Sequence, residues 1–410
     1  MRPAALVAAM CAGQLGSLLP HMAFSGLIPR FAGLWSLSAA ESGAIAGAFF
    51  IGYAAVVPLT ATLTDRVDAR RILVAGSLLS ALATFAFAAF ARDFWSAALL
   101  WAIAGAGFAG AYMPGLRALT DRLPPGDASR SITLYTSSYS IGVGLSFLGA
   151  QLLERHLGWQ AAFVGVGCGP LVMMMVALSL PAYRPTPRAG ARLLDFRPVL
   201  RNRPAMAFVL GYGAHCFELA AMRAWIVSFW LFTDARSGAP AWLDAIAVSV
   251  AVTMIAMPAS ILGNEMAIRI GRRRLIAGVM IASSLVAIAI ALGIGLASAA
   301  PWPLVLGLLL LHGFAIPADS GSLTAGMVGA AEADYRGATM ALHSTIGFGA
   351  SFVGPLAMGL ALDGFGGPSS AAGWQAAYFL LALTALAGLP ALRLGIARAT
   401  SAASAPAQIR

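Results

Sequence analysis

The stretch Gly158–Phe163 reads GWQAAF, and Gly373–Tyr378 in the second half of the chain reads GWQAAY. Each copy stands at the start of a long apolar run. Three further pairs of segments recur in the same order: IGVGLSFLGA (141–150) with IGFGASFVGP (346–355), GFAGAYMPG (107–115) with GFAIPADSG (313–321), and RRILVAG (70–76) with RRRLIAG (272–278). One such pair could arise by chance in a chain rich in Ala, Gly and Leu, but four in register predict a duplicated unit.

The composition of the chain indicates a membrane protein. Of the 410 residues, 60% are hydrophobic and 10% are charged, whereas soluble domains carry about 25% charged residues. Apolar runs of roughly 20 residues, the length that a helix needs to cross a bilayer, alternate with short polar segments. The sequence therefore predicts an all-α membrane protein with twelve transmembrane helices, over residues 4–28, 39–63, 72–92, 95–119, 131–153, 159–182, 205–232, 243–266, 275–298, 303–329, 338–362 and 374–396.

The arginines predict how these spans are oriented. All 26 basic residues are Arg, and the net charge is +10. Such a charge could indicate nucleic acid as a partner, but the arginines lie between apolar runs, where excess positive charge marks the cytoplasmic side. With a cytoplasmic N-terminus, only Arg30, Arg92, Arg155 and Arg236 fall outside among the arginines that flank the spans. We therefore expect a bacterial inner (plasma) membrane protein with both termini in the cytoplasm and no nucleic acid partner.

The duplication also predicts the domain organisation. An even number of spans inserts both halves the same way up, so the two six-helix bundles are parallel repeats about a pseudo-two-fold axis, with a substrate site between them near the midplane. The longest polar stretch divides the spans six and six. The predicted units are an N-terminal six-helix bundle over 1–182, a cytoplasmic linker over 183–204, a C-terminal six-helix bundle over 205–398 and a cytoplasmic tail over 399–410.

The loop between the second and third spans reads ATLTDRVDARR over residues 61–71. With its twelve spans and six-plus-six division, the chain resembles the major facilitator superfamily, whose signature in this loop is roughly G-x-L-a-D-R-x-G-R-R. The positions that match are Leu63, Asp65, Arg66 and Arg70. The residues that depart from it are Ala61 and Asp68, in place of both glycines, and Ala69, in place of an arginine. Since the loop is a gate in that family, the resemblance implies gating roles for Asp65, Arg66 and Arg70; the alternative is that the arginines only set topology.

Ionisable side chains inside the spans are the candidate site, because charges in a bilayer are costly and usually face the bundle interior. The seventh span carries His215, Glu218 and Arg223, and the tenth carries His312 and Asp319. Within each span the acid and the histidine are three or seven residues apart, so they share one stripe of the helix. We expect both acids to take up and release a proton, assisted by the histidines, and Arg223 to pair with an acid or to bind a substrate anion. The alternative is a structural network that holds the two spans together.

Spans one, four, seven and ten line the central cavity in the family that the chain resembles. Spans one and four supply the remaining candidates for substrate binding and proton coupling, which are Gln14, His21, Tyr112 and Arg117. The two tryptophans of the opening repeat, Trp159 and Trp374, begin the sixth and twelfth spans, and we expect them in the membrane interface.

The sequence thus predicts a proton-coupled secondary active transporter of a small polar metabolite or organic anion, working by alternating access as a monomer in membrane lipid. A drug/proton antiporter-type exporter is an alternative, although the expected Gly-Pro kink is absent from the fifth span. An intramembrane lipid-modifying enzyme or a non-transporting membrane sensor is an alternative of another class. No nucleophile elbow, nucleotide loop or metal-ligand spacing occurs, so we expect no catalytic residue, no cofactor and no metal.

Overall fold

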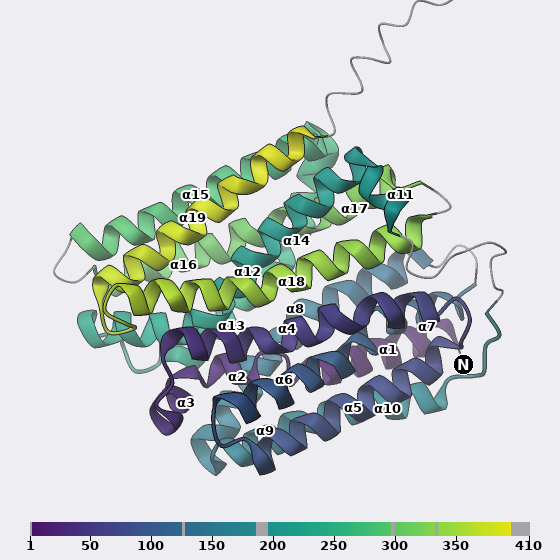
Figure 1. Cartoon of the computed structure of the whole chain (residues 1–410), viewed down its shortest axis with the longest axis horizontal. Helices are drawn as coiled ribbons and strands as arrows, with labels where there is room; N and C mark the ends of the chain where they lie inside the picture. Colours follow the sequence, from purple (N-terminus) through teal and green to yellow (C-terminus); the bar gives the residue numbers. More distant parts are fainter. Residues whose placement is uncertain (1, 125–127, 186–195, 297–299, 333–334, 395–410) are drawn as a thin grey trace, which may run out of the picture.

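The computed structural model describes the chain except for residues 1, 125–127, 186–195, 297–299, 333–334 and 395–410. Every regular element in the described part is a helix, and the helices run side by side in two groups (Figure 1). The start of α1 and the end of α19 both lie on the right-hand side of Figure 1, as an even number of passes requires. The predicted tail over 399–410 and residues 186–195 of the predicted linker fall outside the described residues.

The N-terminal half contains six helical passes, drawn in purple and blue in Figure 1. The first, fourth and sixth passes are broken, and the other three are single helices. In chain order the helices are α1 (Pro3–Leu18), α2 (Ala23–Gly26), α3 (Ile28–Trp35), α4 (Ala39–Leu63), α5 (Ala69–Phe90), α6 (Phe94–Ala109), α7 (Tyr112–Thr120), α8 (Ala128–Leu157), α9 (Trp159–Gly167) and α10 (Gly169–Ser179).

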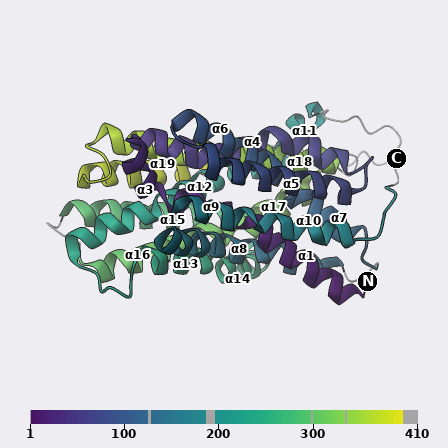
Figure 2. The same ribbon diagram turned by 90° about the horizontal axis from the view of Figure 1, so that it is seen from below.

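The C-terminal half also contains six passes, drawn in teal to yellow, and a short helix precedes them within the predicted linker. The elements are α11 (Arg197–Arg201), α12 (Arg203–Ser237), α13 (Ala245–Met254), α14 (Ala256–Ile270), α15 (Arg272–Leu296), α16 (Trp302–Ala315), the 3-10 turn η1 (Ile316–Asp319), α17 (Ser320–Ala330), α18 (Arg336–Gly364) and α19 (Ala371–Arg393). Seen from below, in Figure 2, the elements of both halves extend along the same long axis of the molecule.

The predicted fold class is confirmed. Ten passes are both long and apolar enough to cross a membrane, and α1 and α8 complete the twelve. Large apolar side chains such as Leu82, Leu99 and Leu383 are more than half exposed, which suits a surface in contact with lipid. The first pass is longer than predicted, because α2 and α3 continue it to Trp35.

Local sequence explains how the second pass begins. Ser38 Oγ accepts a hydrogen bond from the Glu41 N–H at 3.1 Å, and Glu41 Oε2 accepts one from the Ser38 N–H at 2.9 Å. This reciprocal capping box satisfies two N–H groups that the start of a helix leaves without partners. The residues Ser38 to Glu41 therefore fix the start of α4.

The duplication is visible in matching breaks of the backbone. The fourth pass breaks between α6 and α7 at Gly110 and Ala111, and the tenth breaks at η1. Both breaks lie at the same place in the paired segments GFAGAYMPG and GFAIPADSG. The two halves therefore share an interrupted helix at corresponding positions, and in the C-terminal half this interruption carries Asp319.

The halves meet most extensively along α4 and α18. At Gly43 a Cβ atom would collide with the carbonyl group of Pro355, and at Gly359 one would collide with the carbonyl group of Ala39. Glycine at both positions allows two helix backbones to touch, as in other membrane helix pairs. At the end of this contact Asp363 Oδ1 and Oδ2 accept hydrogen bonds from the N–H groups of Ala39 and Ala40, at 2.9 and 2.8 Å. We call this end of the molecule the Asp363 end, and the opposite end the Asp68 end.

The two tryptophans of the repeat are buried within the protein, so they do not face lipid as residues of an interfacial belt would. Trp374 is 0% exposed and Trp159 is 8% exposed. The Trp374 Nε1–H group donates to the Pro368 carbonyl oxygen at 2.7 Å, and Trp159 packs edge-on against Phe31 and Trp35. An indole can be buried where its N–H group finds a partner or its ring finds aromatic neighbours, so the repeated residues anchor helix packing inside each half.

Candidate functional site

The intramembrane acids and histidines form two pairs between the seventh and tenth passes. The His215 Nδ1 and Asp319 Oδ1 atoms are 2.8 Å apart, and the His312 Nε2 and Glu218 Oε1 atoms are 3.0 Å apart. All four side chains are at most 4% exposed. Each helix contributes one acid and one histidine, so the pairs cross between the two helices in opposite directions.

The two pairs differ in geometry. The His312–Glu218 contact has hydrogen-bond geometry, and Ser283 on α15 donates a second hydrogen bond to Glu218 Oε2 at 3.3 Å. The His215–Asp319 contact is as short, but its angle is outside the hydrogen-bond range, so the atoms meet as an ion pair when the imidazole is protonated.

Arg223 stands apart from these pairs. It is 4% exposed, and among the described residues its guanidinium has no hydrogen-bond or ion-pair partner. An arginine retains its charge in proteins, and burying a charge without a partner is costly. Of the two sequence-based expectations, pairing with Glu218 or Asp319 is therefore not found, and binding of an anion remains.

Aromatic rings of the N-terminal half lie opposite Arg223. His21, in the break of the first pass, and Tyr139, on α8, are near enough to Arg223 for electrostatic interaction. The Tyr139 hydroxyl and His21 Nε2 form a hydrogen bond of 2.9 Å. The His21 ring contacts further rings of α4 and α6, and we call the whole set the aromatic wall: His21, Phe49, Phe50, Phe108, Tyr112 and Tyr139.

Gln14 lies beside this wall. Its Oε1 atom accepts a hydrogen bond from the Tyr135 hydroxyl at 2.8 Å, and its buried Nε2 atom has no partner among the described residues. The Tyr135 hydroxyl also approaches the Tyr112 carbonyl oxygen at 3.3 Å. The structure thus brings Gln14, His21 and Tyr112 to one region of the N-terminal half, where the Gln14 amide N–H group lacks a partner.

Arg117 does not belong to this region. It lies at the Asp68 end, where its guanidinium forms ion pairs with Asp121 at 2.8 Å and with Asp65 at 3.4 Å. The predicted gate residue Asp65 is therefore tied to its own half through an exposed contact. Arg66 is exposed and unpaired among the described residues, and Arg70 donates to the Leu180 carbonyl oxygen at 2.7 Å.

The most buried ion pair of this loop involves Asp68, which stands where the superfamily signature has glycine. Asp68 Oδ1 lies 2.8 Å from Arg122 Nη2, and both side chains are largely buried. The carboxylate also accepts the N–H group of Arg70, which caps α5, and that of Tyr183 in the linker. Burial by itself raises the pKa of Asp68, but the hydrogen bonds from Arg122, Tyr183 and Arg70 and the charge of Arg122 outweigh it, so the pKa lies below its ordinary value of 3.8.

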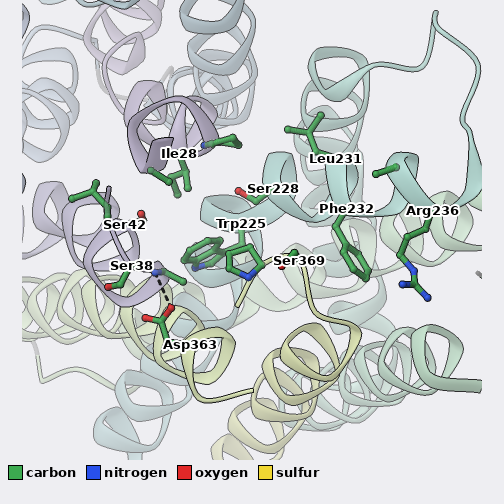
Figure 3. A pocket seen from close by; sticks show the side chains of 16 residues that line it. Ile28, Ser38, Ser42, Trp225, Ser228, Leu231, Phe232, Arg236, Asp363 and Ser369 are labelled. Carbon is green, nitrogen blue, oxygen red and sulfur yellow. Dashed lines mark hydrogen bonds between the residues drawn. The ribbon is translucent and has the colours of Figure 1, made fainter. Parts of the chain in front are cut away.

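A cavity of about 530 Å³ lies at the Asp363 end (Figure 3). Its walls come from both halves, with Ser38, the cap of α4, and Ser42 of α4 facing Ser228 and Phe232 of α12. Trp225 also lines it and lies two residues beyond Arg223 on α12. In a helix this spacing is a rise of about 3 Å, so the cavity lies close to the level of the Arg223 backbone.

Sequence reasoning did not single out several residues of the site. Asp68 was noted only as a departure from the signature, although a carboxylate in place of glycine was itself the signal. Tyr139, Ser283 and Asp363 are polar or charged residues on apolar helices or at their ends, a weak signal that does not identify their partners.

Comparison with known proteins agrees with this architecture. A family model described as Major Facilitator Superfamily matches residues 4–293. The chain is similar to the gallate transporter of Pseudomonas putida, with 32% identity over 145 residues (34% of this chain and 31% of that protein), and to the niacin transporter NiaP of Acinetobacter baylyi, with 27% identity over 147 residues (36% and 33%). It thus spans about a third of the length of these relatives. Among solved structures, the POT family transporter PepTSo has a TM-score of 0.74 at 12% identity, covering 97% of this chain and 98% of the other.

Proposed function

Because the chain belongs to the Major Facilitator Superfamily, a family of secondary transporters, we propose that it carries a small organic anion across the membrane by alternating access, coupled to protons. Family membership makes the chain a transporter and sets aside the lipid-modifying enzyme. The buried charges bear on the substrate and on the driving force.

The unpaired guanidinium of Arg223 carries the proposal for an anion. A buried cation without a protein partner is compensated when a ligand supplies the negative charge, and a carboxylate matches the two parallel N–H groups of a guanidinium. The position of Arg223 on the seventh pass, beside His21 and Tyr139 of the other half, suits a site between the halves.

The aromatic wall supports a flat, aromatic carboxylate as the substrate class. Rings arranged edge-on and offset around a site favour stacking with another ring. Gallate and niacin, named for the two relatives, are both aromatic rings that bear a carboxylate. In the proposed complex the carboxylate binds Arg223 and the ring lies against Tyr139 and Tyr112.

The two acid–histidine pairs supply the proton coupling. Each pair can hold one proton between a carboxylate and an imidazole, and histidine exchanges protons near neutral pH. Arg223 lies on α12 together with His215 and Glu218, so the anion and the protons bind to side chains of the same helix. Loading of the anion and of the protons can therefore favour the same movement of the C-terminal half.

The contacts between the halves support one conformational state. The inter-half contacts described above, including Asp363 with the start of α4, gather at the Asp363 end. A further ion pair joins Arg155 to Asp244 at 3.3 Å near this end. With the orientation proposed from the arginines, the Asp363 end faces outward, so contacts that hold the two halves together there support an inward-facing state. The loop with Asp65 and Asp68 lies at the cytoplasmic end, where we propose that it acts as a gate.

Uptake into proteoliposomes tests the proposal. We expect labelled niacin to accumulate when the lumen is made alkaline, and accumulation to collapse when a protonophore removes the gradient. Nicotinamide is the matched probe, because it has the same ring without the charge, and it should not be transported. Protein-free liposomes correct for passive entry. Equal transport of the amide would overturn the anion site, and accumulation that survives the protonophore would overturn proton coupling.

A further inference from the structure

Three rings lie nearly parallel between α12 and α18. The ring of His343 stacks on that of Tyr212, with centroids 3.8 Å apart and planes inclined by 15°. The ring of His215 is also nearly parallel to Tyr212, at 5.7 Å and 14°. The stack therefore extends from α18 to the imidazole that meets Asp319, and it links the eleventh pass to one of the acid–histidine pairs.

His343 is buried without any polar partner. The residue is only 3% exposed, and neither ring nitrogen, Nδ1 or Nε2, has a hydrogen-bond partner among the described residues. A neutral imidazole needs both a donor and an acceptor for full satisfaction. Burying these atoms unsatisfied costs free energy, so packing alone does not account for a histidine here in place of an apolar residue.

The chain makes room for the stack one turn further along α18. A Cβ atom at Gly347 would collide with the Tyr212 ring and would approach Cys216 Sγ to 3.1 Å. The glycine thus lets Tyr212 lie flat against α18, next to His343. The face of a tyrosine ring attracts a cation placed over it, so this geometry favours the protonated form of the histidine that stacks on it.

Few charged groups oppose protonation of His343. On α12 the titratable neighbours are Tyr212, His215 and Cys216, and η1 adds Asp319 beyond His215. On α4 the neighbouring titratable group is Tyr53, which stacks on Phe348. The described residues place no Arg in an ion pair with this group. Burial is the larger opposition to the charged form of His343, and His215 adds repulsion when it is itself protonated.

We propose that His343 is a proton-binding group of the transporter, in addition to the two acid–histidine pairs, and that Tyr212 holds its imidazolium. The proton comes from water when the Asp68 end is open, since His343 lies seven residues, about 10 Å of helix, from the start of α18. Because His215 and His343 interact with the same ring, a proton on one disfavours a proton on the other. The inference rests on the proton coupling proposed above and adds a binding group to it.

Histidine NMR tests the proposal without depending on transport. The chain has five histidines, so the signal of His343 in ¹⁵N-histidine protein in nanodiscs is identified by its loss in His343→Gln. Burial opposes the charged form and the Tyr212 ring favours it, so we expect this signal to titrate below the ordinary range of a histidine but above about pH 4.5. Tyr212→Phe keeps the ring and should leave the midpoint within a few tenths of a pH unit, whereas Tyr212→Leu removes the ring and should lower the midpoint clearly. A His343 signal that stays neutral down to about pH 4.5 would overturn the proposal.

Transport provides the second measurement. In His343→Gln, exchange of labelled for unlabelled niacin at equal pH should remain within about twofold of wild type, whereas the pH dependence of net uptake should flatten. A His343→Gln protein whose net uptake has the wild-type pH profile would contradict the proposal. If wild type does not transport niacin, the substrate assignment fails, and the NMR titration still decides whether His343 binds a proton.

Discussion

Glu218 Oε1 and His312 Nε2 lie 3.0 Å apart, although 94 positions separate the two residues in the chain. Neither side chain is more than 4% exposed. The seventh and tenth passes are therefore joined by a pair of side chains that can hold a proton inside the membrane. Substitution of its acid tests whether the pair takes part in proton coupling.

Replacing Glu218 by Gln should uncouple transport from protons. Glutamine keeps the shape and an acceptor oxygen toward His312, but it cannot titrate, so we expect gradient-driven uptake of niacin to fall by about tenfold or more, the effect of a 1.4 kcal/mol change. Exchange at equal pH should persist. Glu154→Gln is the matched control, since Glu154 meets Arg30 in a partly exposed pair and its loss should change little. Full gradient-driven uptake by Glu218→Gln would remove this residue from the coupling.

Replacing Arg223 should weaken binding of the anion. Hydrogen bonds to charged groups contribute about 1.5–3 kcal/mol, so Arg223→Ala should raise the KM for niacin by roughly 10- to 150-fold. Arg223→Lys keeps the charge without the forked geometry, so its KM should lie between that of wild type and that of Arg223→Ala. The control is Arg30→Ala, which removes an arginine whose side chain is 55% exposed. An unchanged KM in Arg223→Ala would place the anion elsewhere.

Removing the Asp363 carboxylate should open the Asp363 end. In Asp363→Ala the N–H groups of Ala39 and Ala40 lose their acceptors from the other half, so the closed contact is weakened. We expect a cysteine introduced by Ser228→Cys, in the cavity at that end, to react several-fold faster with a membrane-impermeant maleimide.

The matched comparison for Asp363 is Asp244→Ala. It breaks the exposed ion pair with Arg155, which also joins the halves but contributes only about 0–1 kcal/mol as a surface pair. Equal labelling rates in both variants would show that capping of α4 by Asp363 does not hold the halves together.

The Asp68–Arg122 pair predicts a pH-dependent stability. Because the pKa of Asp68 is lowered below 3.8, its ionised form stabilises the folded state fully above that value, and the stabilisation is lost as pH falls through the lowered pKa. Asp68→Asn should therefore reduce the Tm of the detergent-solubilised protein at pH 7, and the difference from wild type should shrink below about pH 4. Asp93→Asn is the control, because Asp93 also caps a helix, α6, but has no arginine partner among the described residues. An equal reduction of Tm in the two variants would contradict a stabilising role for the ion pair of Asp68 with Arg122.

The sequence allowed the architecture to be predicted because its evidence is periodic and long-range. Apolar runs marked the passes, and the echo of GWQAA marked the two halves. The end of the first pass was misplaced, since α2 and α3 follow a break at His21 that hydropathy cannot reveal. The sequence did not show that Trp159 and Trp374 are buried, because a tryptophan at the start of a span can face either lipid or its own bundle.

The sequence predicted which ionisable residues lie inside the spans, but not which of them contact one another. Spacing placed His215 with Glu218 on one stripe and His312 with Asp319 on another, yet it did not reveal that the pairs cross between the helices. That outcome depends on the seventh and tenth passes running side by side in opposite directions, which brings His215 level with Asp319 and Glu218 level with His312. Arg117 was assigned to the cavity because its span lines it, but its depth along the helix brings it instead to Asp65 and Asp121.

The length of α18 has a mechanical consequence. This single helix carries His343 seven residues from one end and Asp363 one residue from the other, so the two are separated by about 30 Å along its axis. One group lies beside the buried rings, and the other holds the first turn of α4. A tilt of this one rod therefore displaces both at once, and a lever of this kind can transmit the arrival of a proton on one side of the membrane to a seal on the other without any change in the residues between them.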